Sequence, residues 1–484
     1  MQQPEEAPAE HETGTLEKRT RFYYGFGSVA YGIKDNGFGY FLLIYYNQVL
    51  GLPATWASQA IFIALLLDAF SDPIVGNVSD RLHSRLGRRH PFMYAAAIPV
   101  ALSFYALWNP PALEQDDLFV YLLVNAVLVR TFITFYEVPS TALAPELTSH
   151  YDERTRLASA RHFFGWAGGI GIAVFAYLVL FEKVGDVEGQ LLPEGYQAYG
   201  VVGATLMAIA ILVSAAGTHR HIPDLMSPPP RRRASLTRSL EETRETLNNR
   251  SFLAIFGFGI FAAMAGGLSA AMNVYLYTFF WGFQAHQIGL IVPSGLLSAT
   301  IAFVAAPRAA MRFGKKRAAI GLSLCAASFA PTPYLARFAG VFPENGTGEL
   351  LMAMIAYNII EVAFIITSTT LVSAMMADVV EESELETGRR SEGIFFAARS
   401  FISKSLSGLG IVLATALLAV IDFPTGAQPG EIDPLIIRNL GLGYFPMIVV
   451  LYFSAIACLA GYQISREQHA ANVAALRKRR EPTA

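Results

Sequence analysis

The stretch that decides the fold is residues 62–91, FIALLLDAFSDPIVGNVSDRLHSRLGRRHP. It begins as an apolar run of the kind that crosses a membrane and ends in a dense basic loop. Two carboxylates, Asp68 and Asp72, stand four residues apart in the apolar part, so they project from one face of a helix. Two acids in hydrocarbon are costly unless a cation, a proton or a base joins them. The spacing therefore predicts a site for an exchangeable Na⁺ or H⁺, to which Ser71 adds a nearby oxygen.

The composition indicates a single polytopic membrane protein. The 484 residues are 53% hydrophobic and 15% charged, whereas soluble domains carry about 25% charged residues. The net charge of −2 gives no reason to expect a nucleic-acid partner. Cys325 and Cys458 lie in separate apolar runs, which predicts neither a disulfide framework nor a metal cluster.

Twelve apolar runs of about 20 residues predict an all-α protein with twelve transmembrane helices. The runs are 22–50, 55–80, 91–109, 118–146, 155–182, 197–217, 251–281, 287–312, 317–338, 348–378, 391–422 and 436–465. The loop RLGRRHP at 85–91 is echoed by RFGKKRA at 312–318, after the eighth run. This repeat predicts two pseudo-symmetric six-helix halves, the arrangement of the major facilitator fold.

The predicted domain organisation has five parts. They are a disordered N-tail at 1–21, a first bundle at 22–217, a linker at 218–250, a second bundle at 251–465 and a C-tail at 466–484. Basic residues gather in alternate loops, and the opposite loops are nearly free of Lys and Arg. The positive-inside rule therefore predicts an inner-membrane protein with both termini in the cytoplasm, and we expect it to act as a monomer in the bilayer.

Charged residues deep in the spans are candidate functional groups. Lys34 and Asp35 are adjacent, so their side chains leave the helix about 100° apart, which predicts partners on other helices. In the fourth span Arg130, Thr134 and Glu137 recur at four and three residues and share a face.

The remaining buried charges supply candidate partners. Arg161 is predicted to be the counter-ion of Glu137 or Asp35, with a surface arginine as the alternative. Lys404 lies deep enough in its span to meet Asp68 and Asp72 as a tethered cation that competes with the ion. A static pair of one aspartate with Lys34 or Lys404 is the alternative.

Other features have weaker interpretations. Trp166 is predicted to be a packing residue, and Glu361 and Arg399 have no assigned role. The acidic and then basic stretch at 378–392 predicts an inner-face helix and salt-bridge gate, or else a solvated loop. The sequence holds no GxSxG, HExxH, Walker A or CxxC motif, so we expect neither an enzyme nor a cofactor. The lack of an ATP-binding loop favours secondary transport.

The chain resembles the glycoside–pentoside–hexuronide:cation symporters of the major facilitator superfamily over nearly its whole length. The resemblance rests on KD (Lys34, Asp35), DxxxDP with its basic loop, YEVP around Glu137, Arg161, ADVVEESELETGRRSEG and Lys404. It implies a shared Na⁺ or H⁺ site with Asp68 and Asp72 as carboxylates, Ser71 and Thr134 as further ligands and Lys404 beside them. It also implies sugar-binding roles for Lys34, Asp35, Glu137 and Arg161.

The sequence departs from that family at three positions. Glu137 stands where the sugar porters have Asp, Thr141 where they have an aromatic residue, and Ser71 where a well-known member has an amide. The YEVP-type span is also similar to the animal lysophospholipid symporters of the same superfamily. The expected function is cation-coupled symport of a small polar solute, a sugar or glycoside, with a lysolipid or other amphiphile as the alternative substrate.

Overall fold

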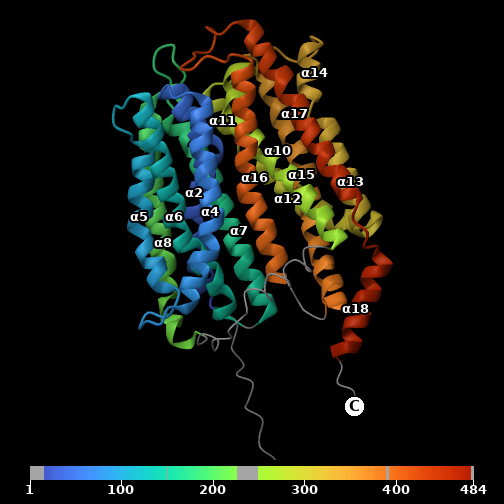
Figure 1. The fold of residues 1–484 in the computed structure, drawn as a ribbon. Helices are drawn as coiled ribbons and strands as arrows, with labels where there is room; N and C mark the ends of the chain where they lie inside the picture. Colours follow the sequence, from blue (N-terminus) through green and yellow to red (C-terminus); the bar gives the residue numbers. More distant parts are fainter. Residues whose placement is uncertain (1–15, 149, 226–248, 388–391, 481–484) are drawn as a thin grey trace, which may run out of the picture.

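The computed structural model describes residues 16–148, 150–225, 249–387 and 392–480, and these residues are helical throughout apart from short connections (Figure 1). Eleven helices in this described part are long and apolar enough to cross a membrane. The predicted first span is helical too, but it is built from short consecutive pieces. The all-α prediction is confirmed. The predicted linker and N-tail lie largely outside the described residues, so those boundaries stay predictions.

The first bundle contains six membrane passes. The first pass is α1 (Lys18–Phe26), α2 (Ser28–Asn36), η1 (Gly37–Phe41), α3 (Leu42–Ile44) and η2 (Tyr45–Val49). The η1 and η2 pieces are π-helical, and such wider turns often mark functional sites. The other passes are α4 (Ala54–Arg81), α5 (His90–Trp108), α6 (Gln115–Leu147), α7 (Tyr151–Phe175) with η3 (Ala176–Leu180), and α8 (Pro193–Thr218).

The second bundle repeats this arrangement. Its passes are α10 (Arg250–Tyr275) with η6 (Leu276–Phe280), α11 (Ala285–Ile291) with α12 (Ser294–Phe313), α13 (Lys315–Phe329) with α14 (Thr332–Phe338), α15 (Gly348–Thr387), α16 (Glu392–Val420) and α17 (Pro434–Ala460). Pro293 and Pro331 mark the breaks between the paired helices, because proline lacks the N–H that a continuous helix needs. A final helix, α18 (Arg466–Arg480), follows beyond α17.

The two basic loops confirm the internal repeat. Gly87 and Gly314 occupy equivalent places and both have a positive φ, +70° and +79°, which glycine adopts without strain. The basic residue two positions after Gly87 is Arg89, whose Nε donates to Glu146 of α6 at 3.0 Å. Lys315, directly after Gly314, pairs with Asp378 of α15 at 2.6 Å. The second of these pairs supports the predicted salt bridges of the 378–392 stretch, of which residues 388–391 lie outside the described part.

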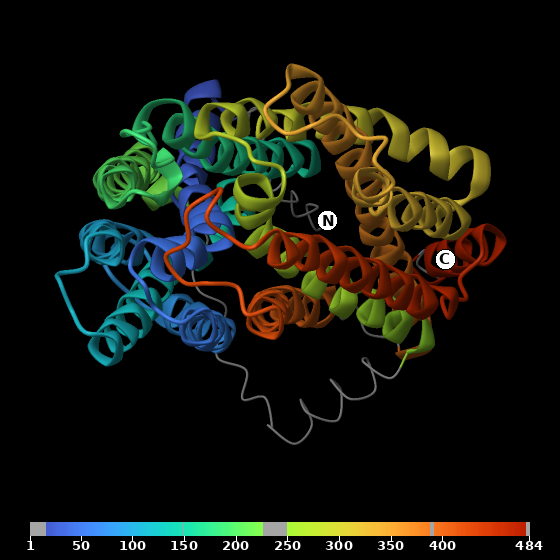
Figure 2. The same ribbon diagram turned by 90° about the horizontal axis from the view of Figure 1, so that it is seen from above.

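The two bundles meet along α4 and α16, and α10 lies against η1 (Figure 2). Several hydrogen bonds join the bundles at the end of the molecule opposite the two basic loops. There the Gln48 amide donates to the Pro424 carbonyl at 3.2 Å and accepts from the Ala427 N–H at 2.9 Å. The Tyr275 hydroxyl donates to the Asn47 side chain at 2.7 Å. The central space is therefore closed by hydrogen bonds at this end.

Candidate functional site

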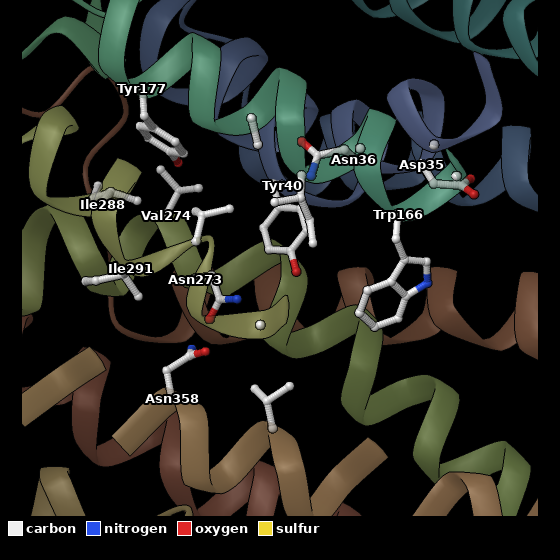
Figure 3. A pocket seen from close by; sticks show the side chains of 18 of the residues that line it. Asp35, Asn36, Tyr40, Trp166, Tyr177, Asn273, Val274, Ile288, Ile291 and Asn358 are labelled. Carbon is white, nitrogen blue, oxygen red and sulfur yellow. The ribbon is translucent and has the colours of Figure 1, made fainter. Parts of the chain in front are cut away.

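A cavity of about 460 Å³ lies between the two bundles (Figure 3). Three amides line it, from Asn36 on α2, Asn273 on α10 and Asn358 on α15. Trp166 of α7 also lines it and is 46% exposed, so the expectation that this residue packs in the core is wrong. Aromatic surface with a few amides from both halves is the usual lining of a small-solute site.

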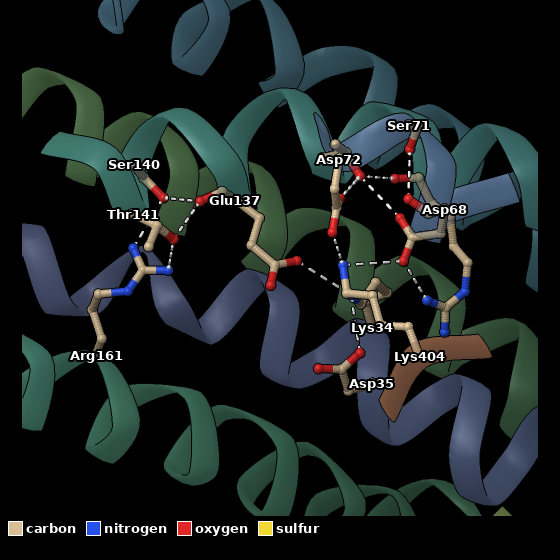
Figure 4. A network of polar contacts seen from close by, with 12 residues as sticks. Lys34, Asp35, Asp68, Ser71, Asp72, Glu137, Ser140, Thr141, Arg161 and Lys404 are labelled. Carbon is tan, nitrogen blue, oxygen red and sulfur yellow. Dashed lines mark hydrogen bonds and ion pairs between the residues drawn. The ribbon is translucent and has the colours of Figure 1, made fainter. Parts of the chain in front are cut away.

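The two carboxylates of the predicted cation site lie close together, beside Thr134 and Lys404 (Figure 4). Asp68 and Asp72 of α4 share one face, and the Thr134 hydroxyl of α6 lies 2.9 Å from Asp68 Oδ1 and 3.2 Å from Asp72 Oδ1. Lys404 Nζ of α16 lies 2.5 Å from Asp72 Oδ2 and 3.3 Å from Asp68 Oδ2. A hydroxyl carries a single proton, so Thr134 donates to one of these acceptors at a time.

Arg130 is the residue of this site to which the sequence analysis gave a helix face but no role or partner. Its Nη1 donates to Asp68 Oδ2 at 2.9 Å, and its guanidinium lies 4.6 Å from the ring centroid of Phe38. Arg130 precedes Thr134 by one helical turn on the face already identified, and this spacing was the available signal. Arg130 and Lys404 are two bases beside two acids, Asp68 and Asp72. These four side chains together carry no net charge when all of them are ionised.

Ser71 is not brought to the carboxylate oxygens in the same way. Its hydroxyl donates to the backbone carbonyl of Asp68 at 3.0 Å, one turn back along α4 (Figure 4). Serine commonly makes this local bond in helices. In this structure the Ser71 hydroxyl therefore forms no hydrogen bond with the carboxylates of Asp68 and Asp72, beside which it was predicted to act as a cation ligand.

Lys34 holds the second group of charges. Its Nζ lies 3.0 Å from Asp35 Oδ1 and 3.4 Å from Glu137 Oε2. The prediction of a partner on another helix holds for Lys34 with Glu137 but is wrong for Asp35. The reason is that a long lysine side chain can bend back to its neighbour even when the two residues leave the helix in different directions.

Asp35 connects this group to the central space. Its side chain is 60% exposed, against 2% for Lys34. It lines the cavity of about 460 Å³ and also a second cavity of about 400 Å³, which Glu137 and Lys404 border as well. A solute in the first cavity and a cation beside Lys404 would therefore be joined through the Lys34 group.

Arg161 does not pair with either predicted acid. Its guanidinium donates to the Ser140 hydroxyl at 3.0 Å and to the Thr141 hydroxyl at 2.7 Å, and it lies over the rings of Tyr24 and Tyr31. Within the described residues, Arg161 forms no ion pair, because Lys34 has taken Glu137. Thr141, the position of the missing aromatic residue, serves instead as the acceptor for this arginine.

Two helical bundles around a cavity, with ionised side chains held inside the membrane passes, define a polytopic secondary carrier. Residues 23–466 match the family described as MFS/sugar transport protein, and the chain belongs to that family of cation-coupled symporters. It is accordingly an integral membrane transporter and not an enzyme.

Known relatives and a solved structure agree with this assignment. An isoprimeverose transporter of Lactiplantibacillus pentosus is 24% identical, over 82% of this chain and 79% of the relative. A sodium-dependent lysophosphatidylcholine symporter of Gallus gallus is also 24% identical, over 96% of this chain and 89% of the relative. A crystal structure of a nucleoside transporter superimposes with a TM-score of 0.60 at 15% identity, covering 92% of this chain and 99% of that one. At that identity the last likeness shows the fold alone.

Proposed function

We propose that this protein couples the transport of a sugar or glycoside to a monovalent cation, Na⁺ or H⁺, by alternating access. The observation that carries the proposal is the convergence of Asp68, Asp72 and Thr134 from one bundle with Lys404 from the other. A cation that enters between the two carboxylates neutralises the negative charge that Lys404 otherwise neutralises. Its binding therefore acts directly on a contact between the two halves.

The exposure of the site indicates where the cation exchanges. Asp72 and Lys404 side chains are 23% and 21% exposed, whereas Asp68 is 1% exposed and bonded to Arg130. We expect the cation to replace the Lys404 ammonium at Asp72 while the Asp68–Arg130 pair stays in place. Replacing a built-in cation with an incoming one avoids the cost of an uncompensated charge in a low-dielectric site.

The solute site is assigned to the cavity of about 460 Å³. Sugar hydroxyls both donate and accept hydrogen bonds, and the amides of Asn36, Asn273 and Asn358 offer both functions. Trp166 supplies an aromatic face for the apolar side of a sugar ring. Asp35 lines this cavity, and its ion pair with Lys34 connects it to Glu137 in the cavity of about 400 Å³. Arg161 orients the α6 segment through its hydroxyl contacts.

The transport cycle follows from the two-bundle architecture. In the orientation that the loop charges predict, the hydrogen bonds of Gln48 and Asn47 close the outer end. The two halves then rock about the central site to exchange solute and cation between the two sides. Coupling is reciprocal, so the solute tightens cation binding by the same factor by which the cation tightens solute binding.

A lysolipid or other amphiphile is the second candidate substrate. A smaller cavity of about 160 Å³, lined mostly by apolar side chains of α10, α13, α15 and α17, offers room for part of a hydrocarbon chain. The lysophosphatidylcholine symporter among the relatives is consistent with this alternative. Saturable binding of a labelled lysolipid without any response to glycosides would favour it over a sugar.

The test starts with a thermal-shift screen of purified protein against a panel of glycosides, with and without Na⁺ and across pH. Solutes that stabilise the protein only with cation are then used for uptake by proteoliposomes. Asp68→Asn and Asp72→Asn should abolish cation-driven uptake while the protein still inserts, because the site loses a carboxylate ligand. Asp117→Asn, which removes an exposed acid from the first turn of α6, is the matched control. Wild-type uptake in both site variants would refute the proposal.

A further inference from the structure

Glu361 is a carboxylate deep in a membrane pass that the proposed cation site does not use. It lies 13 residues after Gly348, the first residue of α15, and so about 20 Å along that helix from its end. Its side chain is half-buried and so is not sealed in the core. An ionisable group at such a depth is a functional candidate by default.

The surroundings of Glu361 differ from those of the other membrane carboxylates. Asp35, Asp68, Asp72 and Glu137 each have a lysine or arginine within ion-pair distance. For Glu361 the described residues provide no such cation. The titratable groups that interact with it electrostatically are five tyrosines from η6, α14, α15 and α17, namely Tyr277, Tyr334, Tyr357, Tyr444 and Tyr452.

Phenol groups can donate hydrogen bonds to a carboxylate but cannot neutralise its charge. The hydroxyl of Tyr357, one turn back on the same helix, donates its single proton to the Ala330 carbonyl at 3.1 Å. An unpaired carboxylate in a low-dielectric setting costs several kcal/mol at least, and a proton removes that cost. The tyrosine cluster therefore suits a carboxyl group that gains and loses a proton.

The neighbours of Glu361 along α15 line two cavities. Asn358 and Val362, at three residues before and one residue after Glu361, line the cavity of about 460 Å³. Ile365, one turn further on, lines the apolar cavity of about 160 Å³. Residues three and four apart share a helix face, so Glu361 lies on the face of α15 between Asn358 of the first cavity and Ile365 of the second. The Asn358 amide donates to the Tyr277 hydroxyl at 3.3 Å, which links the tyrosine cluster to the solute cavity.

We propose that Glu361 is a second, proton-binding site in the C-terminal half, separate from the Asp68/Asp72 pair. The carboxylate takes a proton from water in the central cavity to become a neutral carboxyl group, and returns it to water after the halves have rocked. Its occupancy by a proton is independent of which solute is carried. Only the use of that proton in transport rests on the proposed symport function.

The test detects the proton on the carboxyl group itself and needs no solute. Infrared difference spectra of the purified protein are recorded between about pH 9 and about pH 6, a range in which ordinary carboxylates stay ionised. The wild type should gain the C=O stretch of one protonated carboxyl on acidification, and Glu361→Gln should lack that band. Glu349→Gln, an exposed acid in the first turn of the same helix, is the matched control and should keep it.

The other outcomes are equally decisive. Identical difference spectra for the wild type and Glu361→Gln would show that the protonation of Glu361 does not change over this pH range, and they would overturn the proposal. A protonated band present at both pH values would show a proton that does not exchange, and it would overturn the proposal as well. If Glu361→Gln does not fold, Glu361→Asp carries the test, because its shorter acid should shift the band without removing it. None of these results depends on the uptake assays of Asp68→Asn and Asp72→Asn, so the two proposals fail separately.

Discussion

Replacing Lys404 by methionine tests whether an internal ammonium competes with the coupling cation. Methionine keeps much of the side-chain length and volume and removes the charge. Asp72 then loses the partner at 2.5 Å, whereas Asp68 keeps Arg130 at 2.9 Å. The substitution therefore removes one positive charge from beside both carboxylates, leaving Asp72 without an ion-pair partner among the described residues and Asp68 with Arg130 alone.

The magnitude follows from the distances. At an effective dielectric of about 20, Coulomb's law gives about 7 kcal/mol for a pair at 2.5 Å and about 5 kcal/mol at 3.3 Å. Desolvation offsets most of this attraction, and close charge pairs retain a coupling of about 2 kcal/mol or more in double-mutant cycles. In the variant, an incoming cation no longer has to displace an ammonium that is held by about 2 kcal/mol. The cation should therefore bind about 30-fold more tightly.

The assay is cation-dependent thermal stability of the purified protein, followed by uptake in proteoliposomes. Without Na⁺ and at alkaline pH, Lys404→Met should be less stable than the wild type, because Asp72 is unpaired. Titration with Na⁺ or acid should restore the stability at concentrations about 30-fold lower than the wild type needs. Uptake should nevertheless fall, because no internal cation remains to expel the bound one.

A control variant separates this effect from the general loss of a lysine. Lys183→Met removes an ammonium that pairs with Glu188 at 2.8 Å in a loop where the lysine is 44% exposed. Exposed pairs contribute about 0–1 kcal/mol, so this variant should keep the wild-type cation affinity. Equal or weaker cation binding by Lys404→Met would refute the idea that the ammonium and the cation compete for one place.

Two further substitutions probe the neighbouring parts of the mechanism. Thr134→Ala removes the hydroxyl between the two carboxylates. The cation concentration needed for stabilisation should rise about tenfold, since a hydrogen bond to a charged group contributes about 1.5 kcal/mol. The control Thr205→Ala, at an exposed hydroxyl on α8, should leave that concentration unchanged. Gln48→Ala removes two hydrogen bonds that join the halves at the end opposite the basic loops. The population of the conformation open at that end should rise about fivefold or more. Distances between spin labels on facing loops at that end would report the change. Gln115→Ala, whose amide contacts Gly51 within one bundle, is its control, and an unchanged distance distribution would contradict the closing role of Gln48.

The fold and the placement of the two carboxylates on one helix face could be predicted because both depend on local patterns. The lengths of the apolar runs indicated the membrane passes, and the repeated basic loop indicated the two halves. The four-residue spacing of Asp68 and Asp72 places both on one face whatever the tertiary structure. Lys404 could be predicted as a partner because depth in the membrane restricts which groups can meet.

The pairing of the remaining charges could not be predicted, because it depends on how each helix is rotated. Glu137 took Lys34 and left Arg161 with hydroxyl groups, although an arginine beside an acid suggested the opposite. Arg130 was visible on the right face but had no assigned partner until α4 and α6 were placed side by side. The uncharged lining of the solute cavity was missed for a different reason, since single asparagines in apolar runs carry no spacing signal.

In the proposed mechanism, the distribution of charge between the halves lets cation binding act on their interface. Among the described residues, the ion pairs that join the two bundles are the two made by Lys404. The acids and Arg130 belong to the first bundle, so releasing Lys404 leaves that bundle's own pairing intact and weakens only the contact across the interface. An exchange of Lys404 for a cation at Asp72 therefore changes the energy of the interface more than that of either bundle. That difference is what allows a single small ion to bias a motion of the whole protein.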